Sequence, residues 1–188
     1  MISEVVSKFI QNNMYLIEKN NFSELYHKAD SQLGDYQISE LNIVLSNSGI
    51  DQLSHLEVIP KSMFFRNDGI TEFDVPSNIN GIGSYAFDGC INLKRLNLNK
   101  CSYIHVNGFA GCSELEEVHI PDSMKTLYCS AFENCVSLKK VTYNGTKEQF
   151  KKLLFDDTVF LWCSEELIIY CSDGKLKNEG RYLFDNDK

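Results

Sequence analysis

The feature that most constrains this chain is a short segment that recurs three times at an almost constant spacing. Each copy reads small residue, Phe, any residue, Gly or Asn, Cys, any two residues, and Leu. The copies occupy residues 86–93, 108–115 and 131–138, with their phenylalanines at positions 87, 109 and 132. A degraded copy without the cysteine lies one period upstream, with Phe64, Ile70, Phe73 and Val75 at the equivalent positions. Such a short period predicts a solenoid, because one unit alone cannot bury its apolar face.

Each unit closes with two apolar residues that flank one polar residue. These pairs are Phe73/Val75, Leu96/Leu98, Val118/Ile120 and Val141/Tyr143. A period of two is typical of a strand with one buried face, and stacked units place such strands in a parallel sheet. The Phe and Cys residues then fill the opposite wall of the coil. The sequence therefore predicts an α/β repeat solenoid, a short leucine-rich-repeat array of three to four repeats of 22–23 residues.

The ends of such an array need caps, because an open coil exposes apolar surface and an unpaired strand edge. We expect a helical N-terminal cap over residues 1–58, the repeats over 59–143, and a C-terminal cap and tail over 144–188. The apolar faces expected for the first three helices are Ile2, Val5, Phe9 and Ile17; Phe22, Leu25 and Tyr26; and Ile38, Leu41, Val44 and Leu45. In the C-terminal cap, Thr146 and Gln149 fit a capping box that opens a helix, and a strand over 167–171 follows. The last residues, 176–188, are expected to be a loosely held tail.

The units resemble BspA-type leucine-rich repeats, whose copies read like IPDSMKTLYCSAFENCVSLKKV, residues 120–141. Pro76 and Pro121 follow the strand at matching points, whereas the middle unit has Asn99 there and is one residue shorter. Residues 143–150, YNGTKEQF, resemble the segment that commonly closes such arrays. Residues 168–174, IIYCSDG, resemble an ending found in small repeat proteins of phages and mobile elements. This last resemblance implies a role in countering host defence or redirecting a host protein.

The charge of the chain bears on its partners. The formal net charge is −8, and residues 1–58 contribute −5 of it, from eight acidic and three basic residues. No segment is basic, which argues against direct binding of nucleic acid. No run of about 18 apolar residues occurs, so we expect no membrane-spanning helix.

The cysteines and the first residues bear on the compartment. The chain has seven cysteines, an odd number. Its start, MISEVVSKFIQNN, lacks the basic stretch and apolar core of an export signal. Together these features predict reduced thiols and a cytoplasmic location.

The sequence contains no recognisable motif for catalysis or metal binding. Cys90, Cys112 and Cys135 each lie one turn apart rather than in close pairs, so we interpret them as a column of buried structural thiols and not as zinc ligands. The four histidines are scattered, and no nucleophile-and-base motif, phosphate loop or HExxH segment is present. We therefore expect no catalytic residues, no cofactor and no metal, with a hydrolase or metal enzyme as a minor alternative.

Two sets of side chains are candidates for binding a partner. On the sheet, register predicts a column of alternating charge formed by Glu72, Arg95, Glu117 and Lys140, which favours internal pairing. Beside it, the polar column comprises Asp74, Asn97, His119 and Thr142, and we expect it to retain hydrogen-bonding capacity for a partner. On the other wall, we expect Tyr103, His105 and Tyr128 to form an exposed aromatic patch of the kind enriched in interfaces. A merely solvated face is the alternative for both sets.

The favoured hypothesis is a non-enzymatic protein-binding scaffold that acts inside a bacterial cell. In its most specific form the chain is a phage-encoded inhibitor of a bacterial host or defence protein. The alternative is an acidic mimic of nucleic acid that uses the helical region 1–58 to block a nucleic-acid-binding protein. An adhesin is a further possibility, against which the missing export signal weighs.

Overall fold

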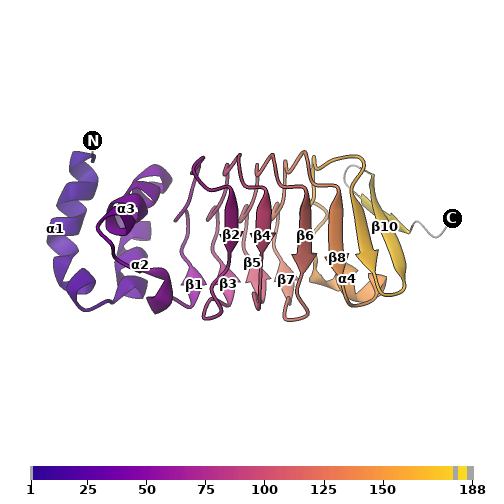
Figure 1. Cartoon of the computed structure of the whole chain (residues 1–188), viewed down its shortest axis with the longest axis horizontal. Coiled ribbons are helices and arrows are strands. Elements are labelled where there is room, and N and C mark those ends of the chain that lie inside the picture. Colours follow the sequence, from indigo (N-terminus) through magenta and orange to yellow (C-terminus); the bar gives the residue numbers. More distant parts are fainter. Residues whose placement is uncertain (1, 180–181, 186–188) are drawn as a thin grey trace.

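The computed structural model describes residues 2–179 and 182–185. Three helices at one end lead into a coil of short strands, and a fourth helix and a strand hairpin close the other end (Figure 1). The first helices are α1 (Glu4–Glu18), α2 (Phe22–Gln32) and α3 (Asp35–Asn47), followed by a single 3-10 turn, η1 (Leu53–His55). One continuous hydrophobic core extends from α1 to the last hairpin. None of the helices described combines the length and the hydrophobicity that a membrane span requires.

The buried face of α1 differs from the expected one. Val6, Phe9, Asn13 and Leu16 are buried, whereas Ile2 and Val5 are exposed. The prediction was correct for Phe9 and wrong for Ile2 and Val5; Ile17 is only partly buried against the core. The reason is Asn13, whose Nδ2 donates a hydrogen bond to the Phe9 carbonyl at 2.9 Å. Because this polar side chain satisfies itself within the helix, it can occupy the buried stripe that an apolar pattern does not reveal.

The other two helices bury the expected faces. Phe22, Leu25 and Tyr26 of α2 are buried, and so are Ile38, Leu41 and Leu45 of α3. Val44 of α3 is only partly buried. The helix ends at Asn47, just before Gly49, whose φ of 74° lies in the left-handed region that glycine adopts without a steric penalty.

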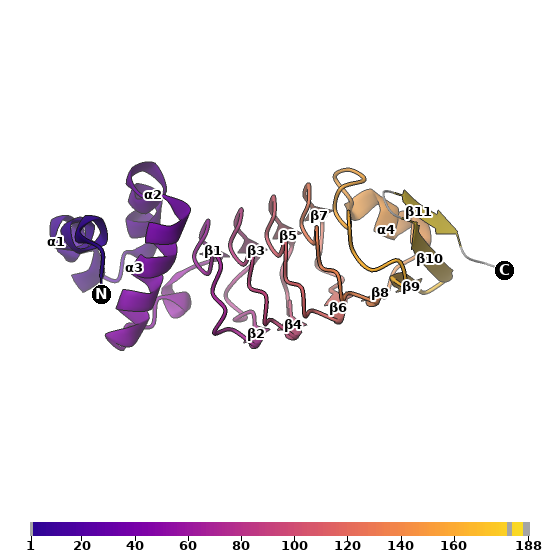
Figure 2. The same ribbon diagram turned by 90° about the horizontal axis from the view of Figure 1, so that it is seen from above.

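The coil consists of two parallel sheets that face each other across the core (Figure 2). The small sheet contains β1 (Val58–Ile59), β3 (Gly81–Ile82), β5 (Tyr103–Ile104) and β7 (Thr126–Leu127). The large sheet begins with β2 (Glu72–Asp74), β4 (Arg95–Asn97), β6 (Glu117–Ile120) and β8 (Lys140–Tyr143). Each strand pairs with its equivalent in the next turn, for example Phe73 with Leu96 and Val118 with Val141. The predicted leucine-rich-repeat solenoid, of about four turns between an N-terminal helical region and a C-terminal helix and hairpin, is thereby confirmed.

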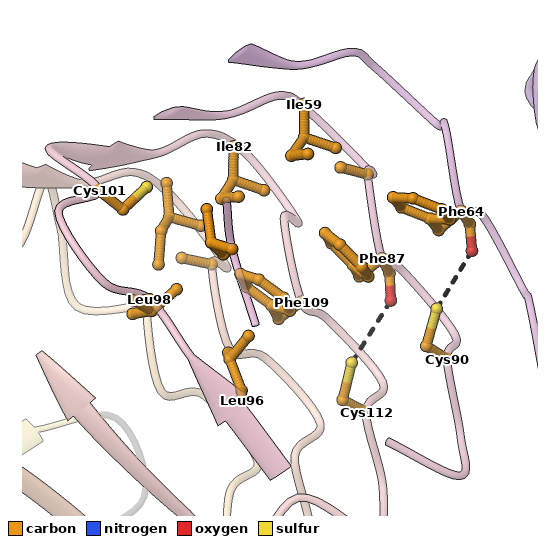
Figure 3. Packing of buried hydrophobic residues seen from close by; sticks show 14 of the residues in the cluster. Ile59, Phe64, Ile82, Phe87, Cys90, Leu96, Leu98, Cys101, Phe109 and Cys112 are labelled. Carbon is orange, nitrogen blue, oxygen red and sulfur yellow. Dashed lines mark hydrogen bonds between the residues drawn. The ribbon is translucent and has the colours of Figure 1, made fainter. Parts of the chain in front are cut away.

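A stack of aromatic rings fills the interior of the coil. The ring centroids of Phe64 and Phe87 are 4.8 Å apart, and so are those of Phe87 and Phe109 (Figure 3). The stack continues from Phe109 to Phe132 at 5.6 Å and from Phe132 to Phe160 at 5.7 Å. Rings that repeat at nearly the spacing of the strands bury each other's faces, which explains why every unit has Phe at this position.

A column of thiols runs beside the rings and links neighbouring turns. The Cys90 thiol donates to the Phe64 carbonyl at 3.1 Å, and the Cys112 thiol donates to the Phe87 carbonyl at 3.4 Å (Figure 3). Cys135 contacts the Phe109 carbonyl at 3.2 Å and Cys163 the Phe132 carbonyl at 3.0 Å. The interpretation of Cys90, Cys112 and Cys135 as buried structural thiols is confirmed, since none of them is exposed. Cys163 is a fourth member that the sequence interpretation did not include.

The position before each of these cysteines has a left-handed backbone. The φ angles are 74° at Gly89, 67° at Gly111, 59° at Asn134 and 56° at Trp162. Glycine and asparagine are the residues that tolerate this region best, which explains the Gly or Asn of the repeat. At Gly89 an added Cβ would also lie only 2.9 Å from Cγ of Arg66.

The C-terminal segment forms one more turn of the coil, into which helix α4 is inserted. Helix α4 (Lys147–Leu153) begins with the predicted capping box of Thr146 and Gln149. Leu154 then bridges to Leu127 of β7, and β9 (Ile168–Cys171) pairs in parallel with β8. The expectation of a loose tail was wrong for the described part, because β10 (Gly174–Glu179) and β11 (Tyr182–Asp185) form an antiparallel hairpin on β9. Residues 180–181 and 186–188 of that tail lie outside the described residues. The expected boundaries at residues 58 and 143 stay predictions.

Candidate partner-binding surfaces

The column of alternating charge lies on the outer face of the large sheet and pairs internally. Nη2 of Arg95 is 2.7 Å from Oε2 of Glu72, and Nζ of Lys140 is 2.8 Å from Oε2 of Glu117. These side chains are largely exposed, so solvent screening keeps the contribution of each pair to stability small. The interpretation that this column serves the register of the sheet is consistent with both ion pairs.

The polar column lies beside it, and its side chains already form more hydrogen bonds and ion pairs within the array than the sequence suggested. Asp74 is opposite Asn97, and His119 is opposite Thr142. Asp74 forms an ion pair with Nη1 of Arg95 at 3.1 Å, which the alternating pattern alone did not reveal. Nδ1 of His119 and Oγ1 of Thr142 are 2.9 Å apart, and Oδ1 of Asn97 accepts the N–H of Asn99 at 3.1 Å. Each of the four side chains therefore already has a partner within the array.

The small sheet carries the aromatic residues on its outer face. The rings of His105 and Tyr128 are stacked, with centroids 4.5 Å apart and an interplanar angle of 19°. Nδ1 of His105 is also 2.8 Å from Oγ of Ser84 in the preceding turn. Tyr103 lies in the neighbouring column, and its ring covers Gly81, where an added Cβ would be 2.1 Å from its Cζ. The structure thus brings His105 and Tyr128 into direct contact and places Tyr103 on the same face.

A further aromatic residue, Phe155, extends this surface. Its ring stacks on that of Tyr128 with centroids 5.4 Å apart, and its N–H donates to the Leu127 carbonyl at 2.8 Å. Its side chain is 61% exposed. We refer to His105, Tyr128 and Phe155 as the aromatic column. The sequence signal for Phe155 is that it follows Leu154 as Tyr128 follows Leu127. The insertion of α4 makes the interval from Tyr128 to Phe155 longer than the period of the preceding units, which hides the match.

Burial disfavours the thiolate form of Cys90, Cys101 and Cys135. Burial raises the pKa of Cys90 to about 12 and that of Cys101 to about 11. Burial also raises the pKa of Cys135 well above its ordinary range. Because the thiolate is the reactive form, these cysteines are structural. Among residues 2–179 and 182–185, no three His, Cys, Asp or Glu side chains are grouped as a metal site would require.

Comparison with known families identifies the type of repeat that forms the array. A family model described as the BspA type leucine rich repeat region matches residues 42–162 in six copies. The chain belongs to the BspA-type leucine-rich-repeat family. The matched BspA-type region extends beyond the three clear copies in both directions, into α3 and as far as the turn that contains Phe160 and Trp162. Proteins built from leucine-rich repeats are generally protein-binding scaffolds. No curated protein matches the chain.

Several solved structures are similar to parts of this BspA-type chain. A leucine-rich repeat protein from Bacteroides capillosus is 31% identical over 46% of this chain and 62% of its own, with a TM-score of 0.42. The leucine-rich repeat protein of T. pallidum is 21% identical over 62% of this chain and 63% of its own, with a TM-score of 0.46. A leucine-rich cell surface protein from Faecalibacterium prausnitzii is 16% identical over 46% of this chain and 35% of its own, with a TM-score of 0.37. The chain spans less than two thirds of each of these three proteins.

Proposed function

We propose that this BspA-type chain is a non-enzymatic scaffold that binds a partner protein through the outer face of the small sheet. The observation that carries the proposal is the aromatic column, in which three stacked rings form one continuous strip and the last ring is 61% exposed. Large aromatic side chains supply much of the binding energy at protein interfaces and lose little conformational entropy on binding. Internal stacking holds these rings in place before a partner arrives, which lowers the cost of binding.

The adjoining surfaces contribute in different ways to the proposed contact. Tyr103 widens the apolar strip by covering Gly81 of the preceding turn. The polar column of the large sheet, comprising Asp74, Asn97, His119 and Thr142, remains a candidate for a second contact. Its side chains have partners within the array, so a protein that binds there competes with some of these existing hydrogen bonds.

The proposed setting is the interior of a bacterial cell. Four buried thiols donate hydrogen bonds to carbonyl groups, and these contacts require the reduced form. The proposed partner is a bacterial host or defence protein that the scaffold inhibits or redirects, and the resemblance of residues 168–174 to phage-borne repeat proteins supports this choice. The alternative is an acidic nucleic-acid mimic, and the ion pairs of Lys61 with Asp30 and Asp35 offset one of the negative charges that the helical region would present.

The test is affinity capture of the tagged chain from a bacterial lysate at low and high salt, with mass spectrometry. The double variant Tyr128→Ala and Phe155→Ala removes two rings of the aromatic column. The control, Ile91→Ala and Val136→Ala, removes two exposed apolar side chains outside that column. We expect the wild type and the control to retain one stoichiometric partner at high salt and the aromatic variant to lose it. Equal capture by all three proteins would contradict the proposed surface, and capture that high salt abolishes would favour the acidic mimic.

A further inference from the structure

The first turn of the coil leaves one edge of the large sheet without a neighbouring strand. Within the described residues, β2 pairs only with β4. The Thr71 carbonyl accepts the N–H of Lys94 at 2.8 Å, and the N–H of Val75 donates to the Asn97 carbonyl at 2.9 Å. Since the peptide groups of a strand alternate in direction, the backbone groups of Glu72 and Asp74 point away from β4. In the described part of the chain, these four outward groups have no hydrogen-bond partner.

The same half of the first turn is also incompletely covered. Ile70 and Phe73 are only partly buried, whereas their equivalents in the next turn, Leu93 and Leu96, are buried. The helical cap packs instead against the segment between β1 and β2, where Ser62 donates to Asp35 at 2.6 Å. The cap is therefore attached beside the segment after β1, whereas Ile70 and Phe73 beside β2 stay partly exposed.

A cavity of about 460 Å³ lies between this open edge and the helical cap. One wall is the edge itself, residues 69–73, and the opposite wall is formed by α3 and residues 50–53. The apolar side chains of the lining are Ile50, Leu53, Met63, Phe64, Ile70 and Phe73. The cavity thus combines unpaired backbone groups along one side with an apolar floor, which is the combination that an added β-strand uses.

The charge around the cavity defines the occupant further. Asp51 and Glu72 are the charged residues in the lining, and both are acidic, although Glu72 also pairs with Arg95 of β4. The adjoining residues 1–58 carry a net charge of −5, from eight acidic and three basic residues. An occupant with basic side chains complements this field, whereas an acidic segment is repelled.

We propose that an extended basic segment of a partner protein binds along the free edge of β2 as an additional strand. Its backbone pairs with the N–H and C=O groups of Glu72 and Asp74, and its alternate apolar side chains enter the cavity over Ile70 and Phe73. The segment takes the place of the turn that the solenoid lacks on this side. The inference shares with the proposed function only the assumption that the occupant is a protein, because the site is separate from the aromatic column.

The first experiment uses a fluorescent octapeptide of alternating Lys and Val as the probe for the full chain. We expect saturable binding by fluorescence anisotropy, and binding at least about tenfold weaker for the same peptide with alternate backbone nitrogens methylated. Amide hydrogen exchange followed by NMR should slow by about tenfold or more at Glu72 and Asp74 when the peptide is bound. Absence of binding, or protection confined to other amides, would overturn the inference.

Two variants test the edge and the charge separately. Glu72→Pro removes an outward N–H and leaves the bonds of Thr71 and Val75 to β4, and Glu72→Gln is its control because it removes the same carboxylate and keeps the N–H. We expect Glu72→Pro to lose at least about tenfold more peptide affinity than Glu72→Gln. Asp51→Lys changes the exposed charge on the opposite wall without touching a strand, and should weaken the Lys-Val peptide and strengthen a Glu-Val peptide. Unchanged affinities in a folded Asp51→Lys variant would refute the basic occupant. The aromatic double variant should bind the peptide normally, which distinguishes failure of this site from failure of the proposed function.

Discussion

The interior stack of rings predicts that removing a ring from the centre of the coil lowers the free energy of unfolding far more than removing a ring from its exterior. Phe109 is fully buried and stacks on Phe87 at 4.8 Å and on Phe132 at 5.6 Å. Replacement of a buried Phe by Ala costs about 3–5 kcal/mol in lost transfer free energy and cavity formation. Because two stacking contacts are lost together, we expect Phe109→Ala to lie at the upper end, at about 5 kcal/mol.

The assay is urea unfolding followed by circular dichroism. With an m value of about 2–3 kcal/mol per M, the midpoint for Phe109→Ala should fall by about 2 M. A loss of this size can unfold a domain of ordinary stability, so Phe109→Leu serves as a milder variant that retains most of the apolar contact. Its expected cost is about 1–3 kcal/mol, the value of the two stacking contacts.

Phe155→Ala is the control for this prediction. Its ring is 61% exposed and stacks on one neighbour, Tyr128. We expect a loss of about 1 kcal/mol or less in the free energy of unfolding. Equal losses for Phe155→Ala and Phe109→Ala, or a loss below about 1.5 kcal/mol for the latter, would refute the view that the interior stack holds the turns together.

Two further predictions concern charge. Burial raises the pKa of Cys90 from an ordinary 9.0 to about 12. The contribution of this thiol to the free energy of unfolding is therefore intact below pH 9 and falls by about 1.4 kcal/mol per pH unit above it, as the unfolded state ionises. In Cys90→Ala the free energy of unfolding should fall less steeply with pH above pH 9, and identical slopes for the two proteins would exclude this linkage. Arg95→Met removes the exposed ion pairs to Glu72 and Asp74. It should lower the free energy of unfolding only slightly, and by still less in about 1 M NaCl, because salt screens exposed charges. A loss as large as that of Phe109→Leu that does not change with salt would show that Arg95 acts through packing.

The columns of Phe, Cys and Leu could be predicted from the sequence because burial recurs at a fixed period there. Phe155 and Cys163 continue the columns of Tyr128 and Cys135, but they follow the insertion of α4 and therefore fall outside that period. An insertion leaves the stacking direction unchanged while it removes the constant spacing by which the columns are recognised. The aromatic column was therefore found without its most exposed member.

The sequence also could not predict side-chain positions that depend on a single hydrogen bond or ion pair. The buried face of α1 was assigned wrongly because Asn13 is buried with its amide bonded to Phe9. The ion pair between Arg95 and Asp74 crosses from one column to the next, so counting charges down each column could not reveal it. In both cases the periodic pattern identified the element correctly and left the partner of one polar group undetermined.

The thiol-to-carbonyl bonds have a mechanical consequence, because each one joins a turn only to the turn before it. A force that pulls the two ends of the coil apart therefore meets resistance one turn at a time. Each turn that detaches would release roughly 70 Å of extended chain. The array would behave under tension as a series of short stretches of chain released in order from its ends, rather than as a single body that breaks at once.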